Sequence, residues 1–339
     1  MPEKKYRNLI VNAGHLLAGI LIIVVVVLIL QAALGYVQVK STPPGWEIIR
    51  PPAEVSTLLI DNDTLWTGGK DGIILISRTN NSRLPLPDGA PPTSYVRQIF
   101  RDHTGSIWIG HDGGLVKFTH ASWEIIAPGP GIPFTKVLSL AERKDGTMVV
   151  GTETDVFVNN GSGWVSLRPG GMPAIASADV LLAPRSGDLW VGCGAVMHGA
   201  LYRLNGTSWH QYTVSDGLPH PAVRALTEVR DGSIWAATGY SRNGGAARYS
   251  DGVWMNLTRA DGLAGESTRS VFEDTHGRIW FGSEYDGIAV HDTGTWKILT
   301  EKEGLAGYEV KTMTEDPDGV YWLGTNGGLT RISSDVVMG

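Results

Sequence analysis

The sequence has little of several features that would point to a specific chemistry. Among its 339 residues there is one cysteine, Cys193, so an intramolecular disulfide and a zinc site built on cysteine pairs are excluded. Charged residues make up only 18% and the net charge is −6, which argues against nucleic acid as a partner. No phosphate-binding loop, GxSxG, HExxH or twelve-residue calcium loop occurs. The sequence therefore predicts no metal, no cofactor and no catalytic residue, and Cys193 is expected to be a buried, inert thiol.

One long hydrophobic run occurs near the N-terminus. From Leu16 to Leu34 the chain is apolar except for one glycine and one glutamine, and nineteen helical residues span about 28 Å. Three basic residues precede the run (Lys4, Lys5 and Arg7), whereas only two occur in the twenty residues that follow it. This bias predicts a cytoplasmic N-terminus with the remainder outside. The alternative is a cleaved signal peptide, for which QAALG is a poor cleavage site.

Tryptophan is abundant, and all twelve copies fall in two slots of a repeat of about 42 residues. The first slot lies in a phrase close to DxxGx(I/L)W(I/V)G and holds Trp66, Trp108, Trp190, Trp235, Trp280 and Trp322, with Val149 taking the place of tryptophan in one further copy. The second slot follows a short turn and holds Trp46, Trp123, Trp164, Trp209, Trp254 and Trp296. A fixed period of this length is typical of a repeat architecture.

Each repeat reads as four short strands. In the fifth copy, strands are expected at 222–229, 233–238, 246–250 and 254–258, separated by turns rich in glycine and aspartate. Seven twisted four-stranded sheets around one axis make an all-β, seven-bladed β-propeller. The tryptophans are interpreted as the packing between neighbouring sheets, because a large ring fills the space that widens between them.

The two ends of the repeat array are complementary. The last copy stops after its third strand, at 329–333, whereas Trp46-Glu-Ile-Ile has the form of a fourth strand with no blade before it. We therefore expect residues 46–49 to pair with the sheet of Trp322, which closes the ring and removes two exposed sheet edges. The predicted organisation is a cytoplasmic tail at 1–8, a transmembrane signal anchor at 9–36, a linker at 37–44, the propeller at 45–333 and a C-terminal tail at 334–339.

A longer phrase, V(R/K)xIxEDxxGxIWxGTxxGGLxR, is present as VRQIFRDHTGSIWIGHDGGLVKF and VKTMTEDPDGVYWLGTNGGLTRI. It resembles the two-component regulator propeller repeat, as do the DGL-type elements at 216–218, 261–263 and 303–305. The resemblance implies a propeller that senses or binds something outside the cytoplasm. A weaker similarity exists to the streptogramin lyase propellers. With one propeller and about eight cytoplasmic residues, the chain is expected to need a separate signalling partner.

Ligands of propellers usually bind at the mouth of the central channel, on the face that carries the loops from second to third strand and from fourth to first. From this face we take, as candidate ligand-binding residues, Arg97, His111, His198, His220, Arg224, Arg242, Arg269, Tyr285 and Lys311. Two insertions, at 193–199 and 238–245, are expected to lengthen loops there into an asymmetric wall.

A basic pattern runs through these candidates. The residues eight positions before the turn glycines are Arg97, Leu138, Asp179, Arg224, Arg269 and Lys311. Such a ring would attract an anionic ligand. The interpretation that we favour is that each cation pairs with a neighbouring carboxylate or lies on a solvated blade face, because side chains of the innermost strand mostly point at adjacent blades.

Three classes of function stay open. The favoured one is a membrane-anchored sensor-type module that binds an unknown small molecule, glycan or protein on the periplasmic or extracellular side. An extracytoplasmic enzyme, lyase-like or hydrolytic, would instead need a cluster of histidine and carboxylate groups at the channel mouth. A structural scaffold would need broad apolar patches on the blade sides.

Overall fold

The computed structural model describes residues 25–26, 42–168, 175, 177–197 and 199–334. The predicted cytoplasmic tail, most of the predicted signal anchor and linker, and all but one residue of the C-terminal tail lie outside these residues. In the described part of the chain, no helix has the length and apolar character needed to cross a bilayer. The compact unit that begins at Pro43 holds every named strand.

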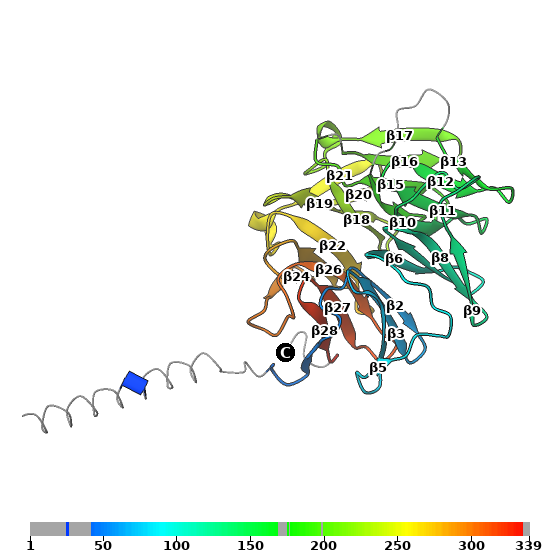
Figure 1. The fold of residues 1–339 in the computed structure, drawn as a ribbon. Helices are drawn as coiled ribbons and strands as arrows, with labels where there is room; N and C mark the ends of the chain where they lie inside the picture. The colour runs from blue at the N-terminus through cyan, green and yellow to red at the C-terminus, as the bar shows by residue number, and fades with distance from the viewer. Residues whose placement is uncertain (1–24, 27–41, 169–174, 176, 198, 335–339) are drawn as a thin grey trace, which may run out of the picture. The chain divides into compact units, whose positions relative to one another are not determined.

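Seven four-stranded antiparallel sheets make up this unit (Figure 1). In six of them strands one to four follow chain order, whereas the outermost strand of the seventh comes from the start of the unit. Blade 1 is β2 (Thr57–Asp61), β3 (Thr64–Gly69), β4 (Gly72–Ser77) and β5 (Arg83–Leu84). Blade 2 is β6 (Val96–Arg101), β7 (Ile107–His111), β8 (Gly114–Thr119) and β9 (Ser122–Ile126). Blade 3 is β10 (Val137–Glu142), β11 (Met148–Thr152), β12 (Val156–Asn159) and β13 (Trp164–Ser166). Blade 4 is β14 (Ala178–Leu182), β15 (Leu189–Cys193), β16 (Leu201–Asn205) and β17 (Ser208–Tyr212).

Two short 3-10 helices connect the later blades: η1 (Val214–Asp216) and η2 (Arg259–Asp261). Blade 5 is β18 (Val223–Glu228), β19 (Ile234–Tyr240), β20 (Asn243–Ser250) and β21 (Val253–Leu257). Blade 6 is β22 (Thr268–Glu273), β23 (Ile279–Ser283), β24 (Ile288–Asp292) and β25 (Thr295–Leu299). Blade 7 is β26 (Val310–Glu315), β27 (Tyr321–Thr325), β28 (Gly328–Ile332) and β1 (Trp46–Ile49). The predicted all-β, seven-bladed propeller is confirmed.

The core is divided among the gaps between blades. Seven hydrophobic clusters occur in the described residues, and each joins two neighbouring sheets, including blades 7 and 1. The tryptophans of the second strands are at most 6% exposed and lie in these clusters. Their predicted role in inter-blade packing is therefore confirmed. Removing such rings from water is the main source of stability in a fold whose strands are short.

An aspartate six residues before the tryptophan locks the ring in place in blades 2, 6 and 7. The indole Nε1 of Trp108 donates to Asp102 at 2.7 Å, and the corresponding bonds of Trp280 to Asp274 and of Trp322 to Asp316 are 2.9 and 3.0 Å. The other carboxylate oxygen of each aspartate accepts two backbone N–H groups of the tight turn. One side chain thus fixes both the turn and the ring, which explains the DxxGxIW spacing.

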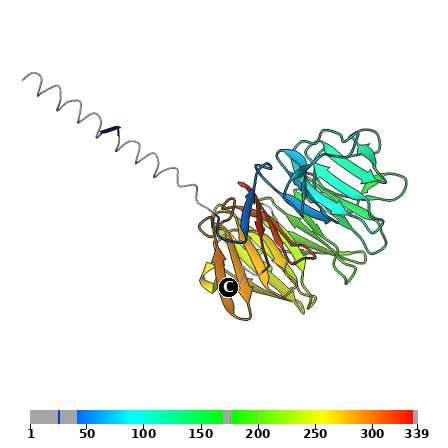
Figure 2. The ribbon, with the colours of Figure 1, turned by 90° about the horizontal axis from the view of Figure 1, so that it is seen from below.

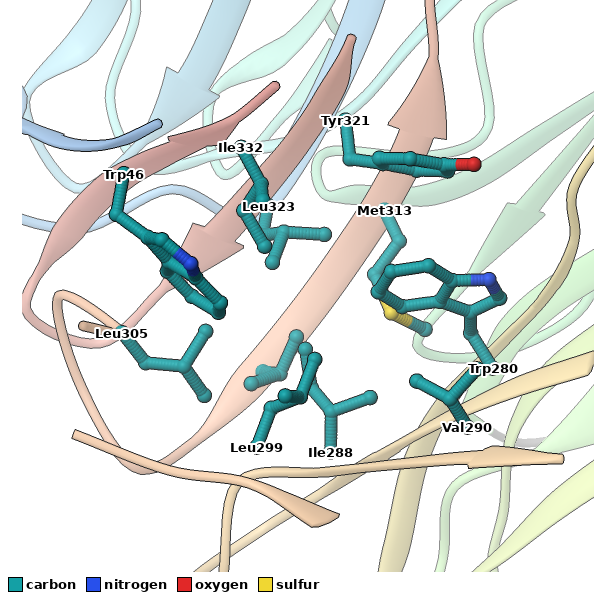
Figure 3. Packing of buried hydrophobic residues seen from close by; sticks show 11 residues of the cluster. Trp46, Trp280, Ile288, Val290, Leu299, Leu305, Met313, Tyr321, Leu323 and Ile332 are labelled. Carbon is teal, nitrogen blue, oxygen red and sulfur yellow. The ribbon is translucent and has the colours of Figure 1, made fainter. Parts of the chain in front are cut away.

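Closure of the ring uses the start of the unit. Trp46 pairs with Ile332 and Ile49 with Leu329, so β1 is the outermost strand of the last blade. This is the pairing that the sequence analysis expects, and Figure 2 shows the blue first strand beside the red last strands. Trp46 is 5% exposed and packs with Leu305 and residues of blades 6 and 7 (Figure 3). Each blade therefore has a neighbour on both sides.

Candidate functional site

In six of the seven blades the innermost strand contains a β-bulge at the same place. The register of β6 shifts between Val96 and Gln98, and β10, β14, β18, β22 and β26 shift at the matching point. A bulged residue is unpaired, and the bulge redirects its side chain. The six bulged residues are Arg97, Leu138, Asp179, Arg224, Arg269 and Lys311. The bulge thus acts on the six residues that the sequence pattern singled out.

The six bulged side chains meet in one cavity of about 160 Å³, which we call the ring pocket. Its lining is completed by Ser56, directly before β2 of blade 1, and by Tyr95. Seven blades thus each supply one residue, from the end where the innermost strand begins. Because the innermost strands of successive blades contact one another around the axis, the ring pocket lies at the mouth of the central channel. All six side chains line the cavity, and those of Arg224, Arg269 and Lys311 also reach a carboxylate of a neighbouring blade or of the segment that leads into it.

The cations of the ring pocket are held by carboxylates, which is the pairing that the sequence analysis favours. Arg97 contacts Asp112 through two nitrogens, Nε to Oδ1 at 2.7 Å and Nη2 to Oδ2 at 3.0 Å. Its guanidinium carbon also lies 4.1 Å from the centre of the Tyr95 ring. Burial by itself raises the pKa of Asp112, but the bond to Arg97 and the charges of Arg97 and Lys136 outweigh it and lower that pKa. A planar guanidinium fixed on two sides is a preorganised donor.

Two further cations share one carboxylate. Arg269 Nε lies 2.9 Å from Glu309 Oε1, and Lys311 Nζ lies 3.5 Å from Glu309 Oε2. Lys311 also contacts Glu54 at 2.9 Å and donates to the Tyr95 hydroxyl at 3.3 Å. Burial alone would lower the pKa of Lys311, yet Glu309 and Glu54 raise it, so the ammonium group stays charged at neutral pH. This side of the pocket is tightly held.

Arg224 is held by one carboxylate and one backbone carbonyl. Its Nη1 lies 3.2 Å from Asp179 Oδ2, and its Nε donates to the carbonyl oxygen of Gly239 at 3.2 Å. Burial, followed by the nearby charge of Arg269, lowers the pKa of Arg224 despite Asp179. Two like charges thus come from the neighbouring blades 5 and 6. Together the four cations are both paired with acids and convergent on one cavity.

His111 and His220 do not line the ring pocket. His111 is 7% exposed, lies 3.3 Å from Ser94 through Nδ1, and accepts the Gly113 N–H at 3.1 Å. His220 is also 7% exposed and accepts the Ala222 N–H at 3.0 Å. Burial lowers the pKa of both rings, and for His220 the charge of Arg224 adds to this. Both histidines shape loops of the mouth rather than face it. His198 lies outside the described residues.

The candidates Arg242 and Tyr285 lie together at a different place. The Arg242 guanidinium is 4.9 Å from the centre of the Tyr285 ring and 3.8 Å from Asp286. Tyr285 and Tyr308 line a second cavity of about 390 Å³. Instead of a loose loop, the insertion at 238–245 extends the β19–β20 hairpin, whose tip residues Ser241 and Arg242 have positive φ. The insertion thus lengthens β19 and β20, and the predicted asymmetric wall, which also includes 193–199, stays a prediction.

Ser56 and Tyr95 are pocket residues that the sequence analysis missed. The residues of the basic pattern were found by counting eight positions back from a turn glycine. The first turn of blade 1, at 61–64, has no glycine, so the count gives no residue there. Tyr95 lies two residues before the ring position, where the other blades carry unrelated residues, so no repeat signal marks it. Cys193 is 2% exposed, as predicted, and burial raises the pKa of its thiol to about 12.

Comparison with known proteins agrees with the fold. The family model of the two-component regulator propeller matches residues 262–285 and 304–327, in blades 6 and 7, which confirms the resemblance. No curated protein sequence matches the chain. The extracellular domain of a hybrid two-component system from B. thetaiotaomicron superposes with a TM-score of 0.70 at 17% identity, covering 86% of this chain and 42% of that one.

Two further solved structures illustrate how widely this fold is used. Virginiamycin B lyase from Staphylococcus aureus gives a TM-score of 0.64 at 10% identity, covering 85% of this chain and 98% of the lyase. PorZ, a surface component of the type-IX secretion system of Porphyromonas gingivalis, gives 0.65 at 14% identity, with coverage of 85% and 47%. The chain thus spans less than half of the two larger neighbours. At these identities the likeness shows the fold alone.

Proposed function

We propose, from the premise that this chain carries repeats of the two-component regulator propeller family, that it is a sensor-type binding module whose ligand site is the ring pocket. The observation that carries the proposal is the convergence of Arg97, Arg224, Arg269 and Lys311 from four blades onto one cavity. Bulges at matching positions place them there, on a rigid scaffold. Charged side chains that are desolvated and held in fixed directions favour recognition of a polar ligand.

The geometry supports binding better than catalysis. Among the described residues that line the ring pocket there is no histidine, and the carboxylate of Asp179 is engaged by Arg224. A general acid–base pair would need groups free to exchange a proton with the substrate. The propeller enzyme considered from the sequence is therefore the weaker alternative.

A thermal-shift screen with the full-length chain tests the binding function. Sugars, peptides and small anions are compared on the wild type, on Arg224→Met, and on Arg83→Met as a control for an exposed arginine of the outer strand β5. A ligand at about 100 times its Kd is expected to raise the wild-type Tm by roughly 5–10 °C, because it binds only the native state. The shift is expected to persist in Arg83→Met and to fall to about half or less in Arg224→Met, as a Kd raised tenfold or more requires. Ligands that stabilise all three chains equally would place binding elsewhere.

Anchoring by residues 9–36 and an extracytoplasmic propeller are parts of the same proposal, with a separate protein passing on the signal. They are tested by cysteine labelling, which the buried thiol of Cys193 permits without background. In intact spheroplasts a membrane-impermeant maleimide is expected to label Ser208→Cys, which is exposed on β17, and to label Pro2→Cys only after lysis. The reverse pattern would contradict this topology, and loss of Pro2→Cys from the mature chain would show a cleaved signal peptide.

A further inference from the structure

The inner surface of the ring pocket is basic, although the site as a whole is balanced. Among the residues that the structure describes, Arg97, Arg224, Arg269 and Lys311 line it together with one carboxylate, that of Asp179. The other carboxylates that hold these cations are not part of the lining: Asp112, Glu54 and Glu309. A ligand in the cavity would therefore contact the four cations and Asp179 directly, whereas Asp112, Glu54 and Glu309 do not line the cavity. Burial of the cations strengthens their field, because little water screens it.

Arg224 and Arg269 are two of these cations, and their charges act on each other. They come from matching bulges of neighbouring blades, and the charge of Arg269 disfavours the charged form of Arg224. Arg224 has only 14% of its side chain exposed, and its one carboxylate partner, Asp179, lies at 3.2 Å. An anion between the two guanidinium groups would relieve their repulsion and accept hydrogen bonds from both.

The size of the cavity limits the ligand. About 160 Å³ is below the range of roughly 300–1,000 Å³ that holds drug-sized molecules. A tetrahedral oxyanion or a small polycarboxylate fits in this space as a whole. Lys311 and Arg97 lie on the same lining as the arginine pair, so a second and third negative group of a compact ligand would find partners there.

We propose that the ring pocket binds a compact free oxyanion with two or more negative charges, held chiefly by Arg224 and Arg269 and opposed by Asp179. The proposal rests on the function proposed above and specifies the class of ligand. Asp179 has a defined part in it: its carboxylate, the only one in the described lining, pairs with Arg224 and would repel an anion that enters. This predicts that removing a negative charge from the protein strengthens binding, which no site for a cation would show.

The test is a calorimetric titration of the full-length chain in detergent with inorganic phosphate, sulfate and citrate at low ionic strength. We expect at least one of these anions to bind with a Kd below about 1 mM, and binding to weaken as salt is raised. Arg224→Met and Arg269→Met are each expected to raise the Kd about tenfold or more. Asp179→Asn is expected to lower it several-fold, and Arg83→Met to leave it unchanged.

The outcomes separate this proposal from the more general one. Failure of all three anions to bind, or weaker binding in Asp179→Asn, overturns the anion proposal. If a neutral compound stabilises the wild type but not Arg224→Met in the thermal-shift screen, the binding function stands and only the ligand class is wrong. If Arg224→Met does not fold, Arg269→Met and Asp179→Asn still decide, because they change the lining charge in opposite directions from another blade.

Discussion

Replacing Trp46 with alanine is expected to lower the free energy of unfolding by about 3–5 kcal/mol. Its indole is 5% exposed and packs in the cluster of blades 6 and 7, against side chains that include Leu305 and Ile332 (Figure 3). Gly304 approaches so closely that a Cβ there would lie 3.0 Å from Trp46 Cε3. For a domain of this size the loss corresponds to a fall in Tm of roughly 6–20 °C.

Trp46 is also the anchor of the closing strand, so its loss is expected to have a local signature. Hydrogen exchange should increase in β28, because β1 covers its outer edge. Trp123 is the matched control: it stands in nearly the same local sequence but packs on Phe118, with ring centres 4.6 Å apart, within blade 2. Trp123→Ala should leave the exchange of β28 unchanged. Equal protection of β28 in both variants would show that β1 does not close the ring.

Asp274→Asn is expected to destabilise the protein by about 3–5 kcal/mol, because it leaves a buried guanidinium without its counter-charge. Asp274 Oδ2 accepts from Arg278 Nε at 2.6 Å and from Trp280 Nε1 at 2.9 Å, and it lies 3.3 Å from the Tyr321 hydroxyl. Both Asp274 and Arg278 are under 9% exposed. An asparagine amide would turn a donor toward donors. Asp145→Asn, in the turn of blade 3, is the control.

Asp145 accepts one backbone N–H, that of Thr147, on the surface of the turn. Its replacement is expected to change the stability by no more than about 0.5 kcal/mol. Chemical denaturation of the two variants and the wild type checks this contrast. Similar losses in both would mean that the turn, rather than the buried pair, carries the effect.

The aspartates that accept hydrogen bonds from buried tryptophans make the free energy of unfolding dependent on pH. Burial alone would raise the pKa of Asp274, but the hydrogen bonds from Trp280 and Arg278 outweigh it and lower that pKa. The pKa values of Asp102 and Asp316 are lowered against burial in the same way. A carboxylate whose pKa is lower in the folded state stabilises above its unfolded value of about 3.9, and the gain is lost as pH falls through the folded value. Unfolding free energy should therefore drop below about pH 4, with a smaller slope in Asp274→Asn.

The number of blades and the place of closure were readable from the sequence because two repeating slots, most of them filled by tryptophan, mark the period. In blades 2, 6 and 7 the bond that fixes this tryptophan is local, because it joins the indole to a turn aspartate six residues earlier. In blade 3 the repeat is still recognisable without the tryptophan. Val149 takes its place in the second strand and is fully buried, so the repeat is marked by a buried apolar residue at this position.

The site was only half readable, and the reason is the bulge. Counting from the turn glycines finds Arg97 and Arg224 as equivalent residues, but strand periodicity then assigns their side chains to the space between blades. One extra residue in the innermost strand changes the direction of the side chain. The residues next to Arg97 and Arg224 in the sequence do not indicate that a bulge occurs there. The histidines were overestimated for a related reason, because a loop position does not show that the ring accepts a backbone N–H from its own loop.

The most direct test of the ring pocket as an anion site is an anomalous difference map from crystals of the protein grown with selenate, the heavier equivalent of sulfate. The account predicts a selenium peak inside the ring pocket, with anion oxygens about 2.7–2.9 Å from guanidinium nitrogens of Arg224 and Arg269. Selenate bound only at other surfaces, with the ring pocket holding no peak, would contradict it.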